Sequence, residues 1–197
     1  MARYHHGNLA HALIDAAVRV IEEEGVYALS LRKAARAAGV SHAAPAHHFG
    51  DLRGLLAGVA RRGYEGLLRE MQRPIEGARA LDRLRQIGQG YVTFASERAG
   101  LFRAMFHPQL ARASSPDDAH RQAADATFRY LRGVIEDCQR EGSVRPGDAR
   151  RLAVFAWSTV HGAAALLVDD ALPLDAAAVV EAITRDLYLG LRPLAEG

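Results

Sequence analysis

The sequence predicts an all-α protein, and three observations support this fold class. Apolar residues recur at intervals of three and four along most of the chain, the spacing that places them on one face of a helix. Serine, asparagine, glycine and proline interrupt this pattern where helices are expected to begin and end. No segment alternates β-branched and polar residues over a length that would make a strand.

The pattern in the first third of the chain predicts four helices. Each of the first three follows a residue that can cap a helix, and glycines stand where the helices stop. A longer helix starts after Gly50-Asp51. The three capped segments run from Asn8 to Gly25, from Ser30 to Gly39, and from Ser41 to about Phe49.

The rest of the chain predicts a larger helical domain, separated from the first by Pro74 and Gly77. Proline and glycine divide it again at Gly100, Pro108 and Gly142. We expect two domains and assign residues 1–66 to the first and residues 67–197 to the second. The main helices expected in the second are 81–98, 117–141, 149–170 and 176–191.

The composition is typical of a globular protein. The chain has 197 residues, of which 49% are hydrophobic and 24% charged, so it is long enough to bury a core. The single cysteine, Cys138, excludes an intramolecular disulfide framework and suits a reducing cytoplasm, where we expect the protein. We find no secretory leader and no uninterrupted apolar run of about 20 residues, so we expect no membrane partner.

Positive charge is concentrated near the start of the chain. Between Val26 and Tyr64 there are six cations and one acid, whereas from Leu67 onward 17 cations and 17 acids cancel. A basic segment beside a neutral remainder is typical of a surface that faces a polyanion. Charge alone leaves a simple solvated face as an equal alternative.

Residues 30–41 have the pattern of a helix-turn-helix. Gly39 can take the positive φ that the turn requires, and Val40 can fill the small core beneath it. Ser41 is placed to begin the second helix, whose first turn would then face a major groove. A tight corner between two helices of any other protein is the alternative, but the basic residues on the outer face favour DNA.

These residues resemble a known family. Gly39-Val40-Ser41, followed by His47-His48-Phe49 and Leu55-Leu56, resembles the helix-turn-helix of the TetR (tetracycline-repressor-like) family. The opening Tyr4-His5-His6-Gly7-Asn8-Leu9 is similar to a leader of one subgroup. Trp157-Ser158-Thr159-Val160-His161-Gly162 resembles a Trp…His-Gly signature in the sensing domain of some members.

The resemblance implies a homodimeric transcriptional regulator, expected to be a repressor. Its recognition helices, residues 42–48 here, would enter successive major grooves of a near-palindromic operator, and a small, largely apolar effector would release it. The residues expected at the DNA are Arg3, Tyr4, Ser30, Arg32, Ser41, His42, Ala43, Ala44, His47 and His48.

Two positions depart from the family pattern. Ala46 stands where a tyrosine usually contacts phosphate, and Leu52 stands where a lysine usually begins the next helix. Phosphate contacts supply much of the affinity for DNA, so we expect weaker binding than a typical member shows.

Aromatic residues in the middle of the chain predict an effector cavity. Trp157 and His161 share one helical face, and an aromatic plate with one titratable group suits a small apolar ligand. Each residue could instead be ordinary core, with His161 a satisfied interior histidine. The full set of candidate ligand-binding residues is Tyr91, Phe94, Phe102, Met105, Phe106, Phe128, Trp157 and His161.

The last two long helices, about 149–168 and 176–191, have broad alanine-rich apolar faces. We expect these faces to be buried against a second copy of the chain, with packing inside a monomer as the alternative.

Other function classes find little support in the sequence. It contains no nucleophile elbow, phosphate-binding loop or metal-binding array, so we expect no enzyme, cofactor or bound metal. Adjacent histidines on a helix point about 100° apart, which argues against chelation by residues 5–6 or 47–48. A helical binding protein for hydrophobic small molecules, with no DNA role, remains the alternative function.

Overall fold

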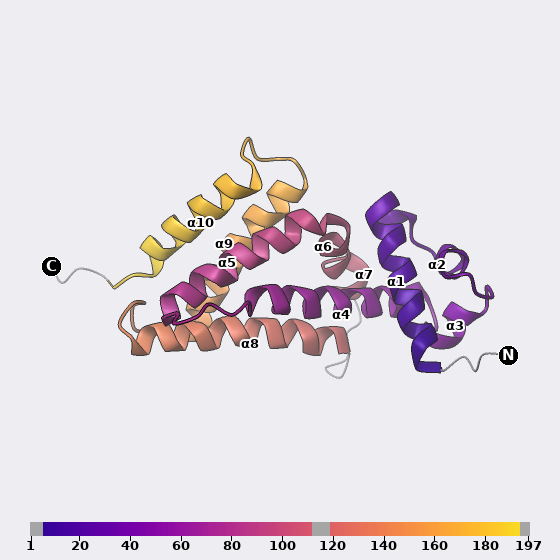
Figure 1. Ribbon diagram of the computed structural model, residues 1–197, viewed down its shortest axis with the longest axis horizontal. Helices are drawn as coiled ribbons and strands as arrows, with labels where there is room; N and C mark the ends of the chain where they lie inside the picture. The colour runs from indigo at the N-terminus through magenta and orange to yellow at the C-terminus, as the bar shows by residue number, and fades with distance from the viewer. Residues whose placement is uncertain (1–5, 112–118, 194–197) are drawn as a thin grey trace. The chain divides into compact units, whose positions relative to one another are not determined.

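The computed structural model describes residues 6–111 and 119–193, and no described residue lies in a β-strand (Figure 1). The predicted all-α fold class is confirmed. In chain order the elements are α1 (His6–Glu24), the short 3-10 helix η1 (Val26–Ala28), α2 (Leu31–Ala38), α3 (Ala44–Phe49), α4 (Leu52–Met71), α5 (Ala80–Glu97), α6 (Ala99–Met105), α7 (Pro108–Ala111), α8 (Ala119–Arg140), α9 (Ala149–Val168) and α10 (Ala176–Leu191).

Most helix boundaries follow the capping residues of the sequence. Asp148 Oδ1 accepts a hydrogen bond from Arg150 N at 2.8 Å and begins α9, and Asp175 Oδ1 accepts one from Ala178 N at 2.8 Å and begins α10. The prediction that Asn8 caps the first helix is wrong. The backbone is already helical at His6, so α1 starts two residues before the predicted cap.

The described residues form two compact units. The first comprises the residues up to Tyr64 together with 98–123, and the second comprises 65–97 and the residues from 124 onward. Helices α4 and α8 therefore contribute to both units. The segment with α6 and α7 follows the predicted boundary at residue 66 in sequence, yet it groups with the first unit.

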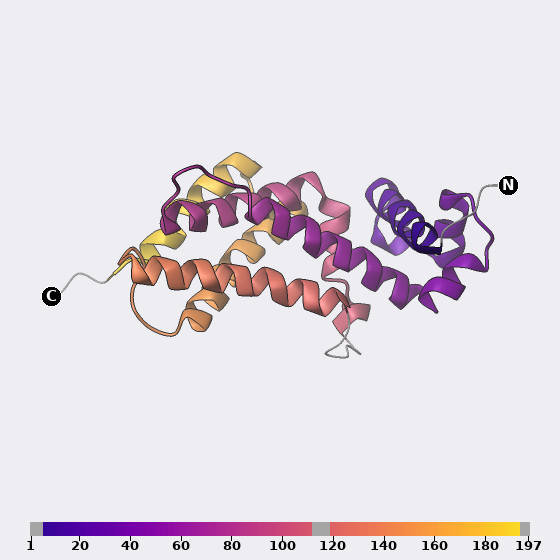
Figure 2. The same cartoon turned by 60° about the horizontal axis from the view of Figure 1, so that its bottom comes forward.

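The first unit is built around α1, seen nearly end-on in Figure 2 with α2 and α3 beside it. Leu13 and Ala17 of α1 and Ala34 of α2 are fully buried. Helix α6 also packs on α1, because the Glu22 carboxylate accepts hydrogen bonds from the backbone N–H groups of Gly100 and Leu101, each at 3.2 Å. These bonds satisfy the first N–H groups of α6 and fix it to the end of α1.

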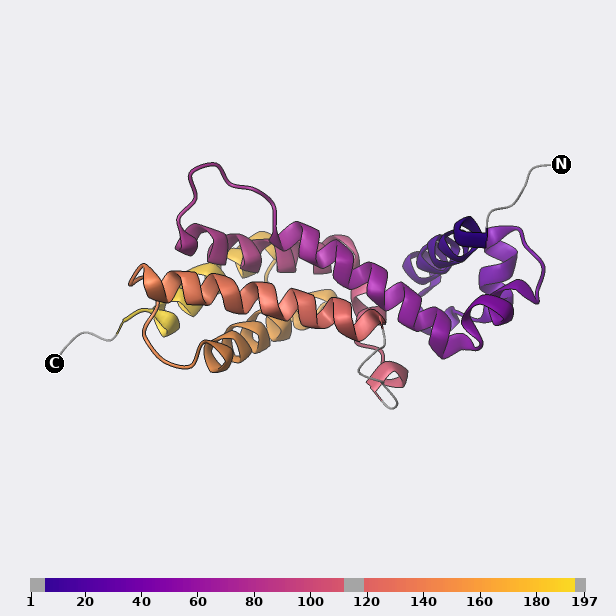
Figure 3. The same cartoon turned by 90° about the horizontal axis from the view of Figure 1, so that it is seen from below.

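The second unit is a bundle in which α5 packs against α9 and α10, and α9 packs against α10. Helix α8 meets α9 at the rings of Phe128 and Trp157, and Figure 3 shows α9 running obliquely to α8. An ion pair of 2.7 Å between Arg83 and Asp137 joins the start of α5 to the end of α8. The Glu141 carboxylate accepts a hydrogen bond from Ala80 N at 3.1 Å and caps α5 from the same side.

Helix α9 combines an apolar composition with low burial. Among the described residues it is the one helix long and apolar enough to cross a membrane by length and composition, but only 28% of its most apolar stretch is buried. One such helix does not indicate a membrane protein, since helices at subunit interfaces have the same composition. The buried positions form one stripe, Leu152, Ala153, Ala156, Val160 and Ala164, which faces the bundle.

Candidate functional site

The turn between α2 and α3 has the geometry that its sequence predicts. Ser30 Oγ accepts a hydrogen bond from Lys33 N at 3.2 Å, which caps α2. Gly39 takes a left-handed conformation, with φ 67° and ψ 32°, and Val40 N donates to Ala35 O at 3.0 Å. This is the hydrogen-bond pattern of a Schellman motif, and it confirms why glycine is needed at this turn.

Helix α3 begins later than predicted. The structure places a turn at residues 42–43 and starts the helix at Ala44, so the prediction that the Ser41 side chain caps this helix is wrong. Ala43 is the capping residue and already has helical backbone angles, with φ −79° and ψ −22°, and no side-chain cap. Pro45 is buried in the first turn, where its missing N–H costs least. The Ser41 hydroxyl is therefore available to other partners.

Ion pairs reduce the positive charge counted from the sequence. Lys33 pairs with Glu24 at the end of α1, and Arg62 pairs with Asp15 at 2.7 Å. Arg32 and Arg36 are exposed on α2, and no ion pair within residues 6–111 and 119–193 involves either of them. The uncompensated charge of this surface therefore lies on α2, directly before the turn.

The structure brings most of the predicted DNA-contacting residues to one stretch of the first unit, from the cap of α2 to the end of α3. Ala44 and His48 are half-buried. Arg3 and Tyr4 lie outside the described residues. The predicted residues that are exposed are Ser30, Arg32, Ser41, His42, Ala43 and His47.

In the second unit, four of the predicted ligand-binding residues form one aromatic cluster. The Tyr91 ring meets the Trp157 ring edge-on, with centroids 5.2 Å apart, and the Tyr91 hydroxyl lies 2.9 Å from His161 Nδ1, at hydrogen-bond distance. The Phe128 ring lies 6.1 Å from that of Trp157. The cluster therefore joins α5, α8 and α9.

Tyr91 and Trp157 line a shallow hollow between α5, α8, α9 and α10 that is open to solvent and holds about 20 Å³ of free space. Its walls are almost entirely apolar, which suits an apolar ligand between helices of a bundle. Its lining residues are Leu84, Ile87, Gly88, Tyr91, Leu131, Ala156, Trp157, Val160 and Leu187.

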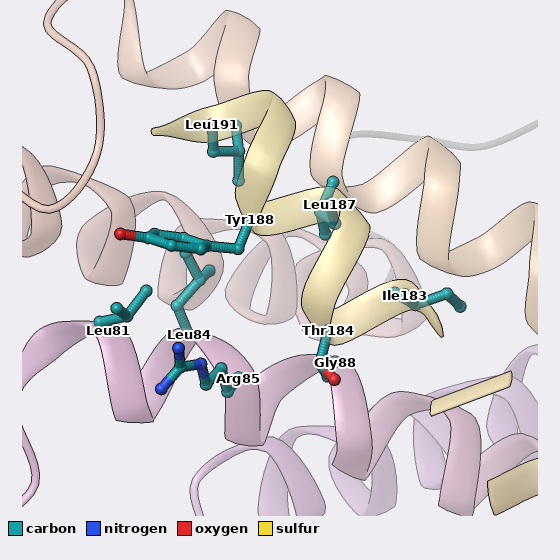
Figure 4. Close-up of a pocket in the computed structure, with 9 residues that line it drawn as sticks. All are labelled: Leu81, Leu84, Arg85, Gly88, Ile183, Thr184, Leu187, Tyr188 and Leu191. Carbon is teal, nitrogen blue, oxygen red and sulfur yellow. The ribbon is translucent and has the colours of Figure 1, made fainter. Parts of the chain in front are cut away.

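A second shallow hollow, also open to solvent and with about 20 Å³ of free space, lies between α5 and α10 (Figure 4). It shares Leu84, Gly88 and Leu187 with the first. Arg85 and Tyr188 stand at this hollow, and the Arg85 guanidinium carbon lies 5.6 Å from the centre of the Tyr188 ring. Neither residue was among the predicted ligand-binding residues, although the spacing of Leu84, Gly88 and Tyr91 in the sequence places all three on one face of α5.

Phe128 and His161 belong to the cluster but line neither hollow, and the other four predicted ligand-binding residues line neither hollow as well. Phe94 is buried in the second unit, where its ring packs over Gly66. Phe102, Met105 and Phe106 belong to the first unit, and the Phe106 ring lies 5.9 Å from that of Tyr64. Their aromatic and sulfur groups contribute to the packing around α6 rather than to the cluster at Trp157.

Comparison with protein families decides the identity. The family description "Bacterial regulatory proteins, tetR family" matches residues 13–59, and "Tetracyclin repressor-like, C-terminal domain" matches residues 84–187. The chain belongs to the TetR family. It is accordingly a DNA-binding regulator of transcription and not an enzyme, as the sequence predicted.

Individual relatives agree with membership of the TetR family. An uncharacterized HTH-type transcriptional regulator of Mycobacterium bovis is 30% identical over 181 residues, which cover 89% of this chain and 90% of that protein. A solved structure of a protein of unknown function from Rhodococcus sp. RHA1 is 34% identical, with a TM-score of 0.82 over 97% of this chain and 99% of that one. FadR from Bacillus subtilis, solved in complex with stearoyl-CoA, shares the fold at 20% identity, with a TM-score of 0.76 over 92% of this chain and 99% of that one.

No group of three or more histidine, cysteine, aspartate or glutamate side chains within the described ranges is arranged to hold a metal ion. The adjacent rings of His47 and His48 meet edge-on with centroids 5.4 Å apart, as expected for neighbours on a helix. The helix-turn-helix and the two hollows are therefore the candidate sites of this TetR-family regulator.

The His161 imidazole predicts how stability depends on pH. Burial lowers its pKa below the ordinary value of 6.5, because burial disfavours the charged form. As the pH falls, the unfolded chain takes up this proton before the folded chain does. The contribution of His161 to folding stability is therefore fully present above about pH 6.5 and is lost as the pH falls below that value.

We expect the melting temperature to fall between about pH 7.5 and about pH 5.5, and to fall less in His161→Gln. Thermal unfolding followed by circular dichroism at both pH values checks this. His47→Gln, an exposed position on α3, is the control and should keep the wild-type pH dependence. Equal pH dependence in the wild type and His161→Gln would show that His161 does not carry the effect.

Proposed function

We propose that the protein is a dimeric, cytoplasmic repressor that binds a near-palindromic operator and leaves it when a small, largely apolar effector binds. The observation that carries this proposal is the exposed surface from Ser30 to His48, with its uncompensated arginines beside a well-formed turn. Such a surface offers phosphate contacts from α2 and base contacts from the start of α3.

Different residues of this surface take different roles in the proposal. Arg32 contacts phosphate, and the Ser30 hydroxyl adds a hydrogen bond from its free proton while its oxygen caps α2.

Ser41 and His42 approach bases or phosphates at the start of the recognition helix. Ala43 and Ala44 are small enough to let that helix sit deep in the groove and to touch thymine methyl groups. His47 and His48 lie near the DNA backbone, and Arg3 and Tyr4 contact phosphate or the minor groove.

The exposed apolar face of α9 supports the proposed dimer. Phe155 is 45% exposed and Leu166 is 48% exposed, and eleven-residue spacing puts both on one face of α9, beside the buried stripe. On α10, Leu189 is 49% exposed. We infer that a second copy covers these side chains, because a surface of this kind on a soluble regulator is typical of a subunit interface.

The cluster around Trp157 supports the proposed effector response. An occupied cavity would favour a conformer in which the two recognition helices no longer match the groove spacing of about 34–36 Å. That FadR, a protein with this fold, was solved with stearoyl-CoA also favours an effector role for this unit. We further propose a functional division at residue 66, and membership of the subgroup that has the Tyr-His-His-Gly-Asn leader and the Trp157…His161-Gly162 signature.

A binding experiment tests the proposal. The fluorescence anisotropy of a labelled duplex from the promoter region beside the protein's own gene is measured against protein concentration, at several salt concentrations, with a scrambled duplex as the control. We expect a complex that prefers the promoter duplex and weakens steeply with salt. A protein that binds hydrophobic ligands but neither duplex would instead be a helical small-molecule carrier.

Restoring the residues that the family usually has at positions 46 and 52 should increase the affinity for DNA. Leu52→Lys adds one cation for each subunit at the start of α4, so we expect tighter operator binding and a salt slope steeper by about 0.9 for each added contact. Ala46→Tyr, at an exposed position of α3, should tighten binding about fivefold through a neutral hydrogen bond and leave the slope unchanged. Anisotropy titrations at several salt concentrations check both variants, and unchanged affinity in both would contradict the assigned positions.

A further inference from the structure

Resting on the proposed effector role of the second unit, we propose that the effector is an elongated amphipathic anion. Its apolar tail occupies the two hollows as one site, and its anionic group binds the Arg85 guanidinium at the outer end. Arg85 is thus the residue that determines specificity for the head group, a role that the aromatic cluster alone does not provide.

The two hollows are continuous in their walls. Leu84 and Gly88 of α5 and Leu187 of α10 line both of them, so the hollows meet at these side chains. Gly88 places no side chain between the two helices, and a Cβ atom there would meet only the Thr184 methyl carbon, at 3.6 Å. In the proposed complex the ligand tail displaces the Leu84 and Leu187 side chains and joins the hollows into one elongated site, which favours a linear ligand over a round one.

The hollow lined by Tyr91 and Trp157, which we call the inner hollow, suits an uncharged group. Tyr91 is 2% exposed, and its hydroxyl is already engaged by His161. The lining of the inner hollow contains no charged side chain. Burying a charge in such a place without a partner is costly, so the apolar end of the ligand belongs here.

The outer end offers one cation. The Arg85 guanidinium packs against the Tyr188 ring, as Figure 4 shows. Its only ion pair among the described residues is with Asp82, at a long 3.5 Å, and both side chains are nearly half exposed. A guanidinium has five N–H donors, so Arg85 retains donors for a carboxylate or another planar anion.

The sole tryptophan, Trp157, lines the inner hollow and reports on its occupation. The experiment titrates purified protein with linear saturated carboxylates, hexanoate to tetradecanoate, with the alcohols of the same lengths, and with the matching alkyltrimethylammonium ions, and follows tryptophan fluorescence. We expect carboxylates to bind about fivefold more tightly than alcohols of equal length, and the ammonium ions to bind most weakly.

Two variants test whether Arg85 causes the preference for carboxylates over alcohols. Arg85→Gln should abolish the difference between carboxylate and alcohol, because both head groups then meet a neutral amide, and Arg85→Lys should retain much of the difference. Arg185→Gln is the matched control, because Arg185 is an exposed cation of α10 that lines neither hollow. A carboxylate preference that survives Arg85→Gln, equal binding of the two head groups in the wild type, or no fluorescence change with any probe would overturn the inference.

Promoter binding, measured on the same preparations, separates the two proposals. A protein that binds the promoter duplex but shows no carboxylate preference overturns this inference and leaves the proposed function standing. A protein that binds no duplex in any preparation overturns the proposed function itself.

Discussion

Phe155→Glu combined with Leu166→Glu is expected to convert the proposed dimer into monomers and to weaken operator binding by about a hundredfold or more. Both side chains are about half exposed on the outer face of α9, and carboxylates there would have to be buried in the interface. A monomer can hold only one half-site, so it loses the gain of about 10² to 10⁴ that binding two linked sites provides.

Size-exclusion chromatography with light scattering measures the mass of this double variant, and anisotropy on the promoter duplex measures its affinity. Arg151→Glu is the control, since it places the same charge at an exposed polar position of the same helix. It should leave both mass and affinity unchanged. A dimer that persists in Phe155→Glu/Leu166→Glu would exclude this face of α9 as the interface.

Arg32→Ala combined with His42→Ala is expected to reduce operator affinity by at least about a hundredfold, with no change in fold. Arg32 is an exposed cation without an ion pair in the described part of the chain, and His42 is exposed in the turn before α3. A base contact is worth about 1–3 kcal/mol, and each lost phosphate contact reduces the salt slope by about 0.9. In a dimer the loss of both Arg32 contacts should reduce the slope by about 1.8.

Anisotropy at several salt concentrations measures both effects, and circular dichroism checks the fold. Arg69→Ala is a suitable control, because Arg69 is an exposed cation of α4 that belongs to the second unit. Binding of the linear carboxylates, followed by the fluorescence of Trp157, should persist in Arg32→Ala/His42→Ala and in Arg69→Ala. Wild-type affinity in Arg32→Ala/His42→Ala would mean that another surface binds the DNA.

Local geometry explains which parts of the fold could be predicted from the sequence. The cap at Ser30 and the positive φ of Gly39 each depend on a few neighbouring residues, and the structure confirms both. The prediction of a cap at Ser41 was wrong because residues 42–43 form a turn and α3 starts only at Ala44, and no single residue in the sequence predicts this turn. The grouping of 98–123 with the first unit depends on contacts such as Glu22 with Gly100, which are distant in sequence.

The same distinction applies to the proposed effector site. Trp157 and His161 could be paired from their spacing on one helix, but their shared contact with Tyr91 depends on how α5 packs against α9. Aromatic content alone could not separate the cluster at Trp157 from Phe102 and its neighbours in the first unit. Arg85 was missed for a related reason, since its position over Tyr188 of α10 brings together two helices from distant parts of the chain.

A hydroxyl-radical footprint of the promoter duplex tests the proposed operator binding most directly. Two recognition helices related by a two-fold axis should protect two segments, with centres about one helical turn, or a multiple of it, apart. Arg32→Ala/His42→Ala should remove both segments together, and the linear carboxylates proposed to bind at Trp157 should do the same in the wild type. A single protected segment, uniform weak protection, or protection that Arg32→Ala/His42→Ala leaves intact would contradict a dimeric regulator that reads its operator through residues 30–48.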